Sequence, residues 1–95
     1  MNYIEWKNTF KKYLYLLPIK EEKETLAYFD EQYNKLNPKD LDNVENIFSD
    51  PIDKAAFVVA FYLEMEDEIK KNEENELLKK LLMKRKRNLF YFLII

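Results

Sequence analysis

The residues best suited to chemistry in this chain are carboxylates, because the sequence contains no histidine and no cysteine. Four of them gather at Glu64, Glu66, Asp67 and Glu68, a density of oxygen ligands that would suit a calcium ion. Calcium sites need ligands that converge around a tight turn, whereas a straight helix spreads such side chains apart. The cluster is therefore interpreted as a solvated helix face, and no metal ligand is assigned.

A second set of carboxylates, Glu5, Glu22 and Asp53, has the residue type needed for general acid–base catalysis. Each of these acids falls in the expected first turn of a helix, where a negative charge is stabilised by the helix dipole. No histidine is present to act as a base, and no cysteine is present to act as a nucleophile. These acids are therefore interpreted as caps and surface charges. We expect no catalytic residue and no cofactor, and a protein that is not an enzyme.

Glycine is also absent from the sequence. Phosphate-binding loops need glycine so that backbone amides can approach the ligand, and tight hairpins need it for left-handed turns. Nucleotide-binding loops of this kind are therefore excluded. The composition favours helices joined by Asn, Asp, Ser and Pro, and the predicted class is all-α.

Two helices are expected over residues 3–16 and 19–36. Asn2 followed by Glu5 resembles a capping box at the start of the first helix, and Pro18 ends it. Apolar residues recur at spacings of three and four along both segments, which is typical of helices with one buried face. They are Trp6, Phe10, Tyr13, Leu14 and Leu17, followed by Leu26, Phe29, Tyr33 and Leu36.

A short third helix is expected over residues 38–48, and a fourth begins at Pro51 with Asp50 as its cap. Residues 55–63 are apolar nearly all round, which favours a helix with a partner on each side. A strand over residues 57–62 remains an alternative. The predicted core consists of Trp6, Phe10, Leu14, Leu26, Phe29, Tyr33, Val44, Phe48, Ala55 and Val59.

The predicted fold is a bundle of three to four helices over residues 1–72, followed by a long, basic C-terminal helix over residues 73–95. Charge separates the two parts of the sequence. Residues 1–76 hold ten lysines and eighteen acids, whereas residues 77–95 hold six cations and no acid. The acidic part would repel nucleic acid phosphates, so no direct nucleic acid binding is expected. Only the C-terminal part is expected to attract an anionic surface.

An ordered set of motifs in the first 64 residues carries a family resemblance. A Leu17-Pro18 step and a charged turn precede the aromatic pair Tyr28 and Phe29. A short helix then ends in Ser49-Asp50-Pro51, and Ala55 follows. Over about residues 4–64 this pattern resembles the HAAS domains, the helix-turn-helix-associated α-helical signalling domains of small bacterial membrane proteins.

The resemblance implies a cytoplasmic N-terminal signalling module of a membrane protein, with a PadR-type transcriptional regulator as a partner. It implies no catalytic residues. This sequence departs from the family pattern at Ser49, where the family has a glycine, and it lacks the glycines common before the short helix. Ser49 is therefore expected to adopt a left-handed or otherwise non-helical conformation, at a cost of about 1 kcal/mol.

The C-terminal residues 83–95, MKRKRNLFYFLII, place four cations before a run of bulky apolar side chains. Cations that precede an apolar run fit the cytoplasmic side of a membrane helix. The eight residues 88–95 are too few to cross a bilayer, so the preferred interpretation is the beginning of a longer membrane span. An oligomer contact and a fifth helix packed within the chain remain alternatives. The predicted membrane-proximal residues are Lys84, Arg85, Lys86, Arg87, Leu89, Phe90 and Tyr91.

The function expected from these patterns is that of a non-enzymatic signalling or interaction domain on the cytoplasmic face of a membrane. The alternative is a soluble, cytoplasmic, homo-oligomeric module whose C-terminal helix forms the contact. Residues 55–63 carry more apolar side chains than one buried face requires, and a narrow leucine stripe follows residue 76. The residues predicted to bind a protein partner, or a second copy of the chain, are Phe57, Phe61, Leu77 and Leu81.

Overall fold

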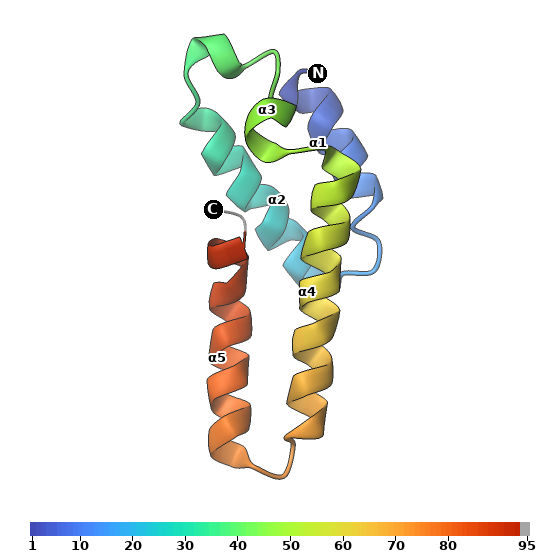
Figure 1. The fold of residues 1–95 in the computed structure, drawn as a ribbon, viewed down its shortest axis with the longest axis vertical. Coiled ribbons are helices and arrows are strands. Elements are labelled where there is room, and N and C mark those ends of the chain that lie inside the picture. The colour runs from blue at the N-terminus through green and yellow to red at the C-terminus, as the bar shows by residue number, and fades with distance from the viewer. Residues whose placement is uncertain (94–95) are drawn as a thin grey trace. The chain divides into compact units, whose positions relative to one another are not determined.

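The computed structural model describes the backbone of residues 1–93 and the side chains as far as residue 84, and the described backbone is helical without any strand (Figure 1). The predicted all-α class is confirmed. Residues 57–62 are helical, so the alternative of a strand there is wrong. The elements are α1 (Tyr3–Lys12), α2 (Ile19–Asn34), the 3-10 turn η1 (Pro38–Asp40), α3 (Glu45–Phe48), α4 (Pro51–Lys71) and α5 (Glu76–Leu93).

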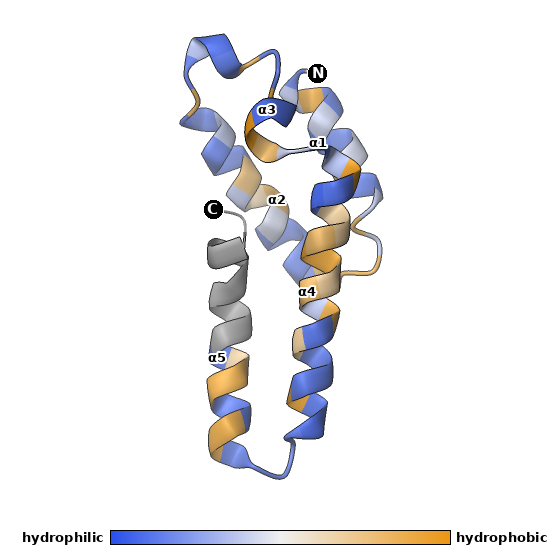
Figure 2. Ribbon diagram, viewed as in Figure 1, coloured by the Kyte–Doolittle hydropathy of each residue, from blue (hydrophilic) through white to orange (hydrophobic). Residues whose placement is uncertain are grey.

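The chain forms two compact units, Met1–Phe57 and Val58–Ile95, and α4 runs through both. Figure 2 shows that the first half of α4 is largely hydrophobic and that its second half is hydrophilic. These units are groups of residues with many mutual contacts. They do not test the predicted division at residue 72, which stays a prediction.

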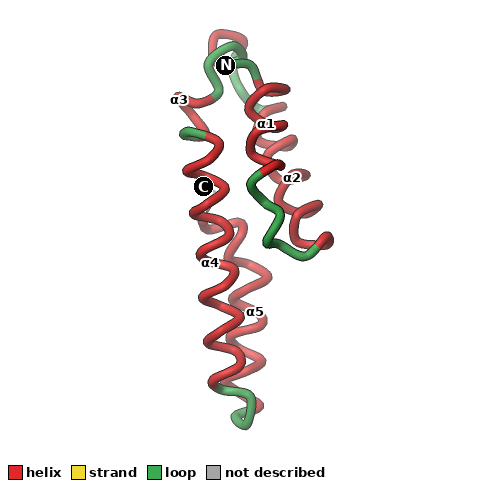
Figure 3. The backbone as a smooth tube through the Cα atoms, turned by 90° about the vertical axis from the view of Figure 1, so that its right-hand side faces the viewer, coloured by secondary structure: helices red, strands yellow, loops and turns green. Residues whose placement is uncertain are grey.

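Within the second unit, the C-terminal half of α4 and α5 run side by side in opposite directions (Figures 1 and 3). Asn72 and Asn75 lie in the short connection between them. The side chain of Asn75 accepts a hydrogen bond of 3.0 Å from the amide of Leu78, which caps the start of α5. This part of the chain is therefore a helical hairpin.

The start of α1 forms as predicted, but its end does not. The side chain of Asn2 accepts a hydrogen bond of 2.9 Å from the amide of Glu5, as a capping residue does. The predicted helix over residues 3–16 is too long, because α1 ends at Lys12. The chain beyond it tightens into turns as it approaches Pro18, which disfavours helical geometry in the residue before it.

The predicted single helix over residues 38–48 is wrong. The chain forms η1, then a turn, and then the short α3. Asp42 and Asn43 lie in the break, and both residue types favour turns over helix interiors. The next residue, Val44, is fully buried, and its amide donates to the Met1 carbonyl across 3.3 Å. This contact holds the chain in place between η1 and α3.

The first unit is packed around the fully buried indole ring of Trp6. Its ring centroid lies 4.8 Å from that of Phe10, 5.0 Å from that of Phe29 and 5.2 Å from that of Phe48. Aromatic pairs at such separations contribute about 0.5–1.5 kcal/mol beyond their buried area. The residues brought together come from α1, α2 and α3, so this aromatic cluster fixes how the three helices pack.

Eight of the ten predicted core residues are buried, Val59 among them in the second unit. Leu26 and Tyr33 are only partly buried, although Tyr33 stacks on Tyr3 with 4.3 Å between ring centroids. The prediction also missed several buried side chains of both units. These are Tyr3, Leu17, Thr25, Tyr28, Val58 and Tyr62.

Candidate functional site

The leucines of α5 form the candidate contact surface that the sequence predicted. Leu77 is 71% exposed and Leu81 is 55% exposed, and Leu78 between them is exposed as well. Figure 2 shows hydrophobic stretches that alternate with hydrophilic ones in the first half of α5. None of the side chains of residues 63–84 is buried. We call Leu77, Leu78 and Leu81 the leucine face of α5.

Cations accompany the leucine face. Lys80 and Lys84 are exposed and Lys79 is partly exposed. In the sequence, Lys84 is the first of the four consecutive cations. The predicted membrane-proximal residues Arg85, Lys86, Arg87, Leu89, Phe90 and Tyr91 belong to the backbone of α5, and their side chains lie outside the described residues.

The two predicted phenylalanines lie in different units. Phe57 ends the first unit and is 43% exposed, and the Lys54 ammonium lies 5.7 Å from the centroid of its ring. A cation at this distance over an aromatic ring is attracted by the ring's negative face. Phe61 is partly exposed and belongs to the second unit, as the leucine face does. Their role in an interface stays a prediction.

The acidic residues of α4 lie on its hydrophilic half. Glu64, Asp67 and Glu68 are exposed, and Asp67 pairs with Lys71 one turn later at 3.0 Å. This contact raises the pKa of Lys71, first through the hydrogen bond to Asp67 and then through its charge. Within the part of the chain that the structure describes, no group of three or more acidic side chains is placed to hold a metal ion.

A polar hollow lies at the end of α4 and has a volume of about 290 Å³. It is open to solvent and is lined by residues 70–75, which include Lys70, Glu73 and Glu74. The lining of the hollow contains both acidic and basic side chains and few apolar atoms. It therefore lacks the enclosed apolar walls that are typical of a small-molecule site.

A partly buried polar contact connects α1 to α2 in the first unit. The Tyr3 hydroxyl donates to Asp30 across 2.6 Å, and the Lys7 ammonium donates to the same carboxylate across 2.9 Å. Burial, followed by the contact with Asp30, raises the pKa of Tyr3 far above its ordinary value. Burial alone would raise the pKa of Asp30, but the hydrogen bonds from Lys7 and Tyr3 and the Lys7 charge outweigh it and lower that pKa. The three groups stabilise helix packing.

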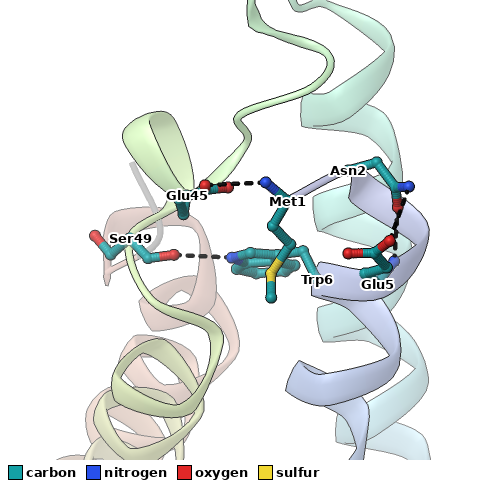
Figure 4. A network of polar contacts seen from close by, with 6 residues as sticks. All are labelled: Met1, Asn2, Glu5, Trp6, Glu45 and Ser49. Carbon is teal, nitrogen blue, oxygen red and sulfur yellow. Dashed lines mark hydrogen bonds and ion pairs between the residues drawn. The ribbon is translucent and has the colours of Figure 1, made fainter.

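A second polar network surrounds the start of α1 (Figure 4). The Trp6 indole N–H donates to the Ser49 carbonyl across 2.8 Å. Ser49 has a φ of 72° and a ψ of 179°, a backbone region occupied almost only by glycine. The expected non-helical conformation of Ser49 is thus confirmed. The strained residue directs its carbonyl at the only buried donor that the Trp6 side chain has.

The same network includes the ammonium group of Met1, which lies 3.0 Å from Glu45 Oε1. A hydrogen bond from its own backbone amide, followed by the contact with the ammonium group, lowers the pKa of Glu45. Asp50 completes the corner between α3 and α4, because its side chain accepts from the amides of Ile52 and Asp53. The predicted cap at Asp50 is confirmed. These contacts are structural.

Sequence reasoning missed one surface, residues 11–20 between α1 and α2. Tyr15 and Ile19 are among the most exposed apolar side chains of the described chain, at 75% and 71%. The amino-acid composition of residues 11–20 is the feature that indicates this surface. The segment contains three lysines and no acid, within a part of the sequence that is otherwise rich in acids.

Within residues 1–93, no helix combines the length and the apolar character that a membrane crossing requires. No family model, no curated protein and no solved structure matches the chain.

Proposed function

We propose that this chain is a non-enzymatic signalling or interaction domain that works at the cytoplasmic face of a membrane. In this proposal a bundle of three to four helices is followed by a long, basic C-terminal helix that meets the lipid surface. One observation carries the proposal. The exposed leucine face of α5 leads directly, in sequence, into the cations of residues 84–87 and then into an apolar run.

Cations followed by apolar side chains are the order of residues that favours binding to an anionic lipid surface. The cytoplasmic leaflet is negatively charged, and each Lys or Arg near it contributes about 1 kcal/mol of binding free energy. Apolar side chains next to the cations gain free energy by leaving water for the lipid. The resemblance to HAAS domains supports the same location and adds a PadR-type regulator as the protein partner.

The test measures binding of the full chain to lipid vesicles. We expect sedimentation with vesicles that contain phosphatidylglycerol and much weaker sedimentation with pure phosphatidylcholine. Replacing all four cations of residues 84–87 with glutamine should weaken binding on the order of several hundredfold, since about fivefold is expected for each cation.

The matched control removes the same charge from elsewhere in the chain. Lys35, Lys39, Lys70 and Lys71 are all exposed, and their replacement by glutamine should change binding less than threefold, on the order of a few tenths of a kcal/mol for distant screened charges. Equal losses in the two variants would show that net charge alone governs binding. That result would contradict the proposal.

A second copy of the chain is the other candidate partner, and one observation favours it. None of the side chains of residues 63–84 is buried, and the acids of α4 residues 64–68 contrast with the lysines of α5. Two hairpins would bury their leucine faces by forming a four-helix bundle. Sedimentation equilibrium without lipid tests this alternative. A dimer that Leu77→Ser and Leu81→Ser convert to monomer would support the soluble oligomer over the membrane module.

A further inference from the structure

The connection between α1 and α2 presents apolar side chains to solvent. Tyr15 and Ile19 are about three-quarters exposed, and Leu16 is 54% exposed. Leu14 and Leu17, which stand on either side of Tyr15 and Leu16 in the sequence, are buried. The Leu17 amide donates to the Leu14 carbonyl across 2.9 Å and closes the turn. The two buried leucines therefore anchor a turn that holds the other side chains outward.

Three lysines lie close to this turn in the sequence. Lys11 and Lys12 precede it and Lys20 follows it, and all three are exposed. Residues 11–20 contain no acid, although the whole chain has a net charge of −2. None of the three lysines forms an ion pair with a described residue. Glu21 and Glu22 follow Lys20 directly, so this surface is apolar at its tip and cationic on the flank that carries Lys11 and Lys12.

We propose that residues 11–20 dock the first unit onto an anionic lipid surface. The three lysines meet the headgroup phosphates, with about a fivefold gain in affinity expected for each. The amphipathic Tyr15 ring occupies the interface between headgroups and acyl chains, as tyrosine does in membrane proteins. Leu16 and Ile19 enter the outer acyl region, where they leave water.

Charge complementarity is the reason for choosing this partner. Outside residues 11–20 the first unit holds five lysines and eleven acids, so the net positive segment 11–20 is the part that best complements an anionic surface. The proposed function uses residues 84–87 of the second unit, whereas this docking segment lies in the first unit. The two proposals share a partner but use different residues, and each can fail without the other.

The absence of native cysteine allows a site-specific test. A solvent-sensitive fluorophore is attached to Leu16→Cys in the full chain, and to Ile4→Cys as a control in the same unit. Ile4 is 73% exposed on α1 and lies outside the docking segment. Vesicles containing phosphatidylglycerol should shift the emission to the blue at position 16 and leave position 4 unchanged.

Three results would overturn the proposal. The first is an unchanged emission at position 16 on vesicles that bind the protein, and the second is an equal shift at position 4. The third is a blue shift that grows with protein concentration without lipid, which would identify a second copy as the occupant. With residues 84–87 changed to glutamine and lipid at saturation, the shift at position 16 should persist. If the blue shift at position 16 were lost in this glutamine variant, docking of residues 11–20 would depend on residues 84–87, and the proposal would fail.

A binding measurement completes the test. Combining Tyr15→Ser, Leu16→Ser and Ile19→Ser should weaken vesicle binding about tenfold, on the order expected for removing three interfacial apolar side chains. The control combines Ile4→Ser with Ile47→Ser, which are also exposed in the first unit, and should leave binding unchanged. Circular dichroism of each variant verifies the fold. A loss as large in the control would contradict docking through residues 11–20.

Discussion

The two units of this chain are built from the same element, the helix, but they differ in what surrounds it. In Met1–Phe57, Trp6 is fully buried among aromatic rings that come from three helices. In Val58–Ile95, the buried side chains among those described are Val58, Val59 and Tyr62, and none from residue 63 to residue 84 is buried. Helical sequence pattern alone therefore does not reveal whether a helix is stabilised by its own core.

The comparison has a thermodynamic consequence. Isolated helices of fewer than about 12–15 residues are marginal in water, and most helical stability in proteins comes from packing of an apolar face. The first unit supplies that packing internally. The second unit leaves its leucine face exposed, and the proposed function assigns that packing to a lipid surface.

The largest effect is expected from Phe29→Ala. The Phe29 ring is 1% exposed and lies within 5.2 Å of the Trp6, Phe10 and Phe48 ring centroids. Its removal should lower the free energy of unfolding by about 3–5 kcal/mol, as for other buried phenylalanines. Chemical denaturation followed by circular dichroism measures the change.

The matched variant in the second unit is Leu81→Ala, which removes an exposed apolar side chain from a helix. It should cost less than about 1 kcal/mol, since surface substitutions rarely cost more. A cost for Phe29→Ala as small as that for Leu81→Ala would mean that the contrast between the units is wrong.

An intermediate effect of the opposite sign is expected from Ser49→Gly. A non-glycine residue in this backbone region costs about 1–3 kcal/mol of stability. Glycine removes that strain, but its greater freedom in the unfolded chain offsets about 0.5–1 kcal/mol of the gain. The net gain should be about 1 kcal/mol in chemical denaturation. Ser49→Ala is the control, because alanine keeps the strain and should give no gain. A Ser49→Gly variant less stable than the parent chain would contradict a strained turn.

The smallest effect is expected from Asp30→Asn. The folded state lowers the pKa of Asp30 below its ordinary value of 3.8, so ionised Asp30 stabilises the fold at neutral pH. That contribution disappears as the pH falls through the lowered pKa. Because the carboxylate is 44% exposed, we expect less than about 1 kcal/mol at neutral pH. Denaturation at neutral and at acidic pH should show the two proteins converging in acid.

The exposed pair of Lys35 and Glu31, 3.4 Å apart on one helix face, provides the control for this experiment. Glu31→Gln should change stability at neutral pH by no more than about 0.5 kcal/mol. A difference between the Asp30→Asn variant and the parent chain that widened in acid would have the wrong sign for this account.

The helical class and several helix starts could be predicted because local chemistry determines them. Asn2 and Asp50 cap helices through their own side chains. The 3–4 spacing of apolar residues also located Trp6 and Phe29 in the core. These features depend on a few neighbouring residues, so the sequence pattern is sufficient to find them.

Features that depend on tertiary contacts were missed. Thr25 is polar and yet fully buried, because its hydroxyl donates to the Glu21 carbonyl one turn back across 2.7 Å. Tyr3 is buried because Asp30 of another helix accepts from its hydroxyl. Leu16 belongs by spacing to an apolar run, but the turns that follow α1 rotate it outward. No local pattern encodes such partners.

The candidate site was predictable only in part. The leucine face of α5 follows from spacing, and Leu77 and Leu81 are exposed as an unoccupied contact surface would be. The pattern of residues 11–20 predicts the end of a helix and a proline stop, and apolar spacing alone does not indicate the exposed turn there. Charge counted over short windows, in addition to apolar spacing, would have found it.

Hydrogen exchange of the full chain, with and without phosphatidylglycerol vesicles, tests the central contrast most directly. Without lipid and at low protein concentration, amides of the packed helices α1 and α2 should exchange slowly, and amides of residues 77–84 should exchange rapidly, because few buried side chains oppose local opening there. Vesicles should slow exchange in residues 77–84 and leave α1 little changed. Slow exchange of residues 77–84 in dilute, lipid-free solution would contradict the account, since the second unit would then be stable without a partner.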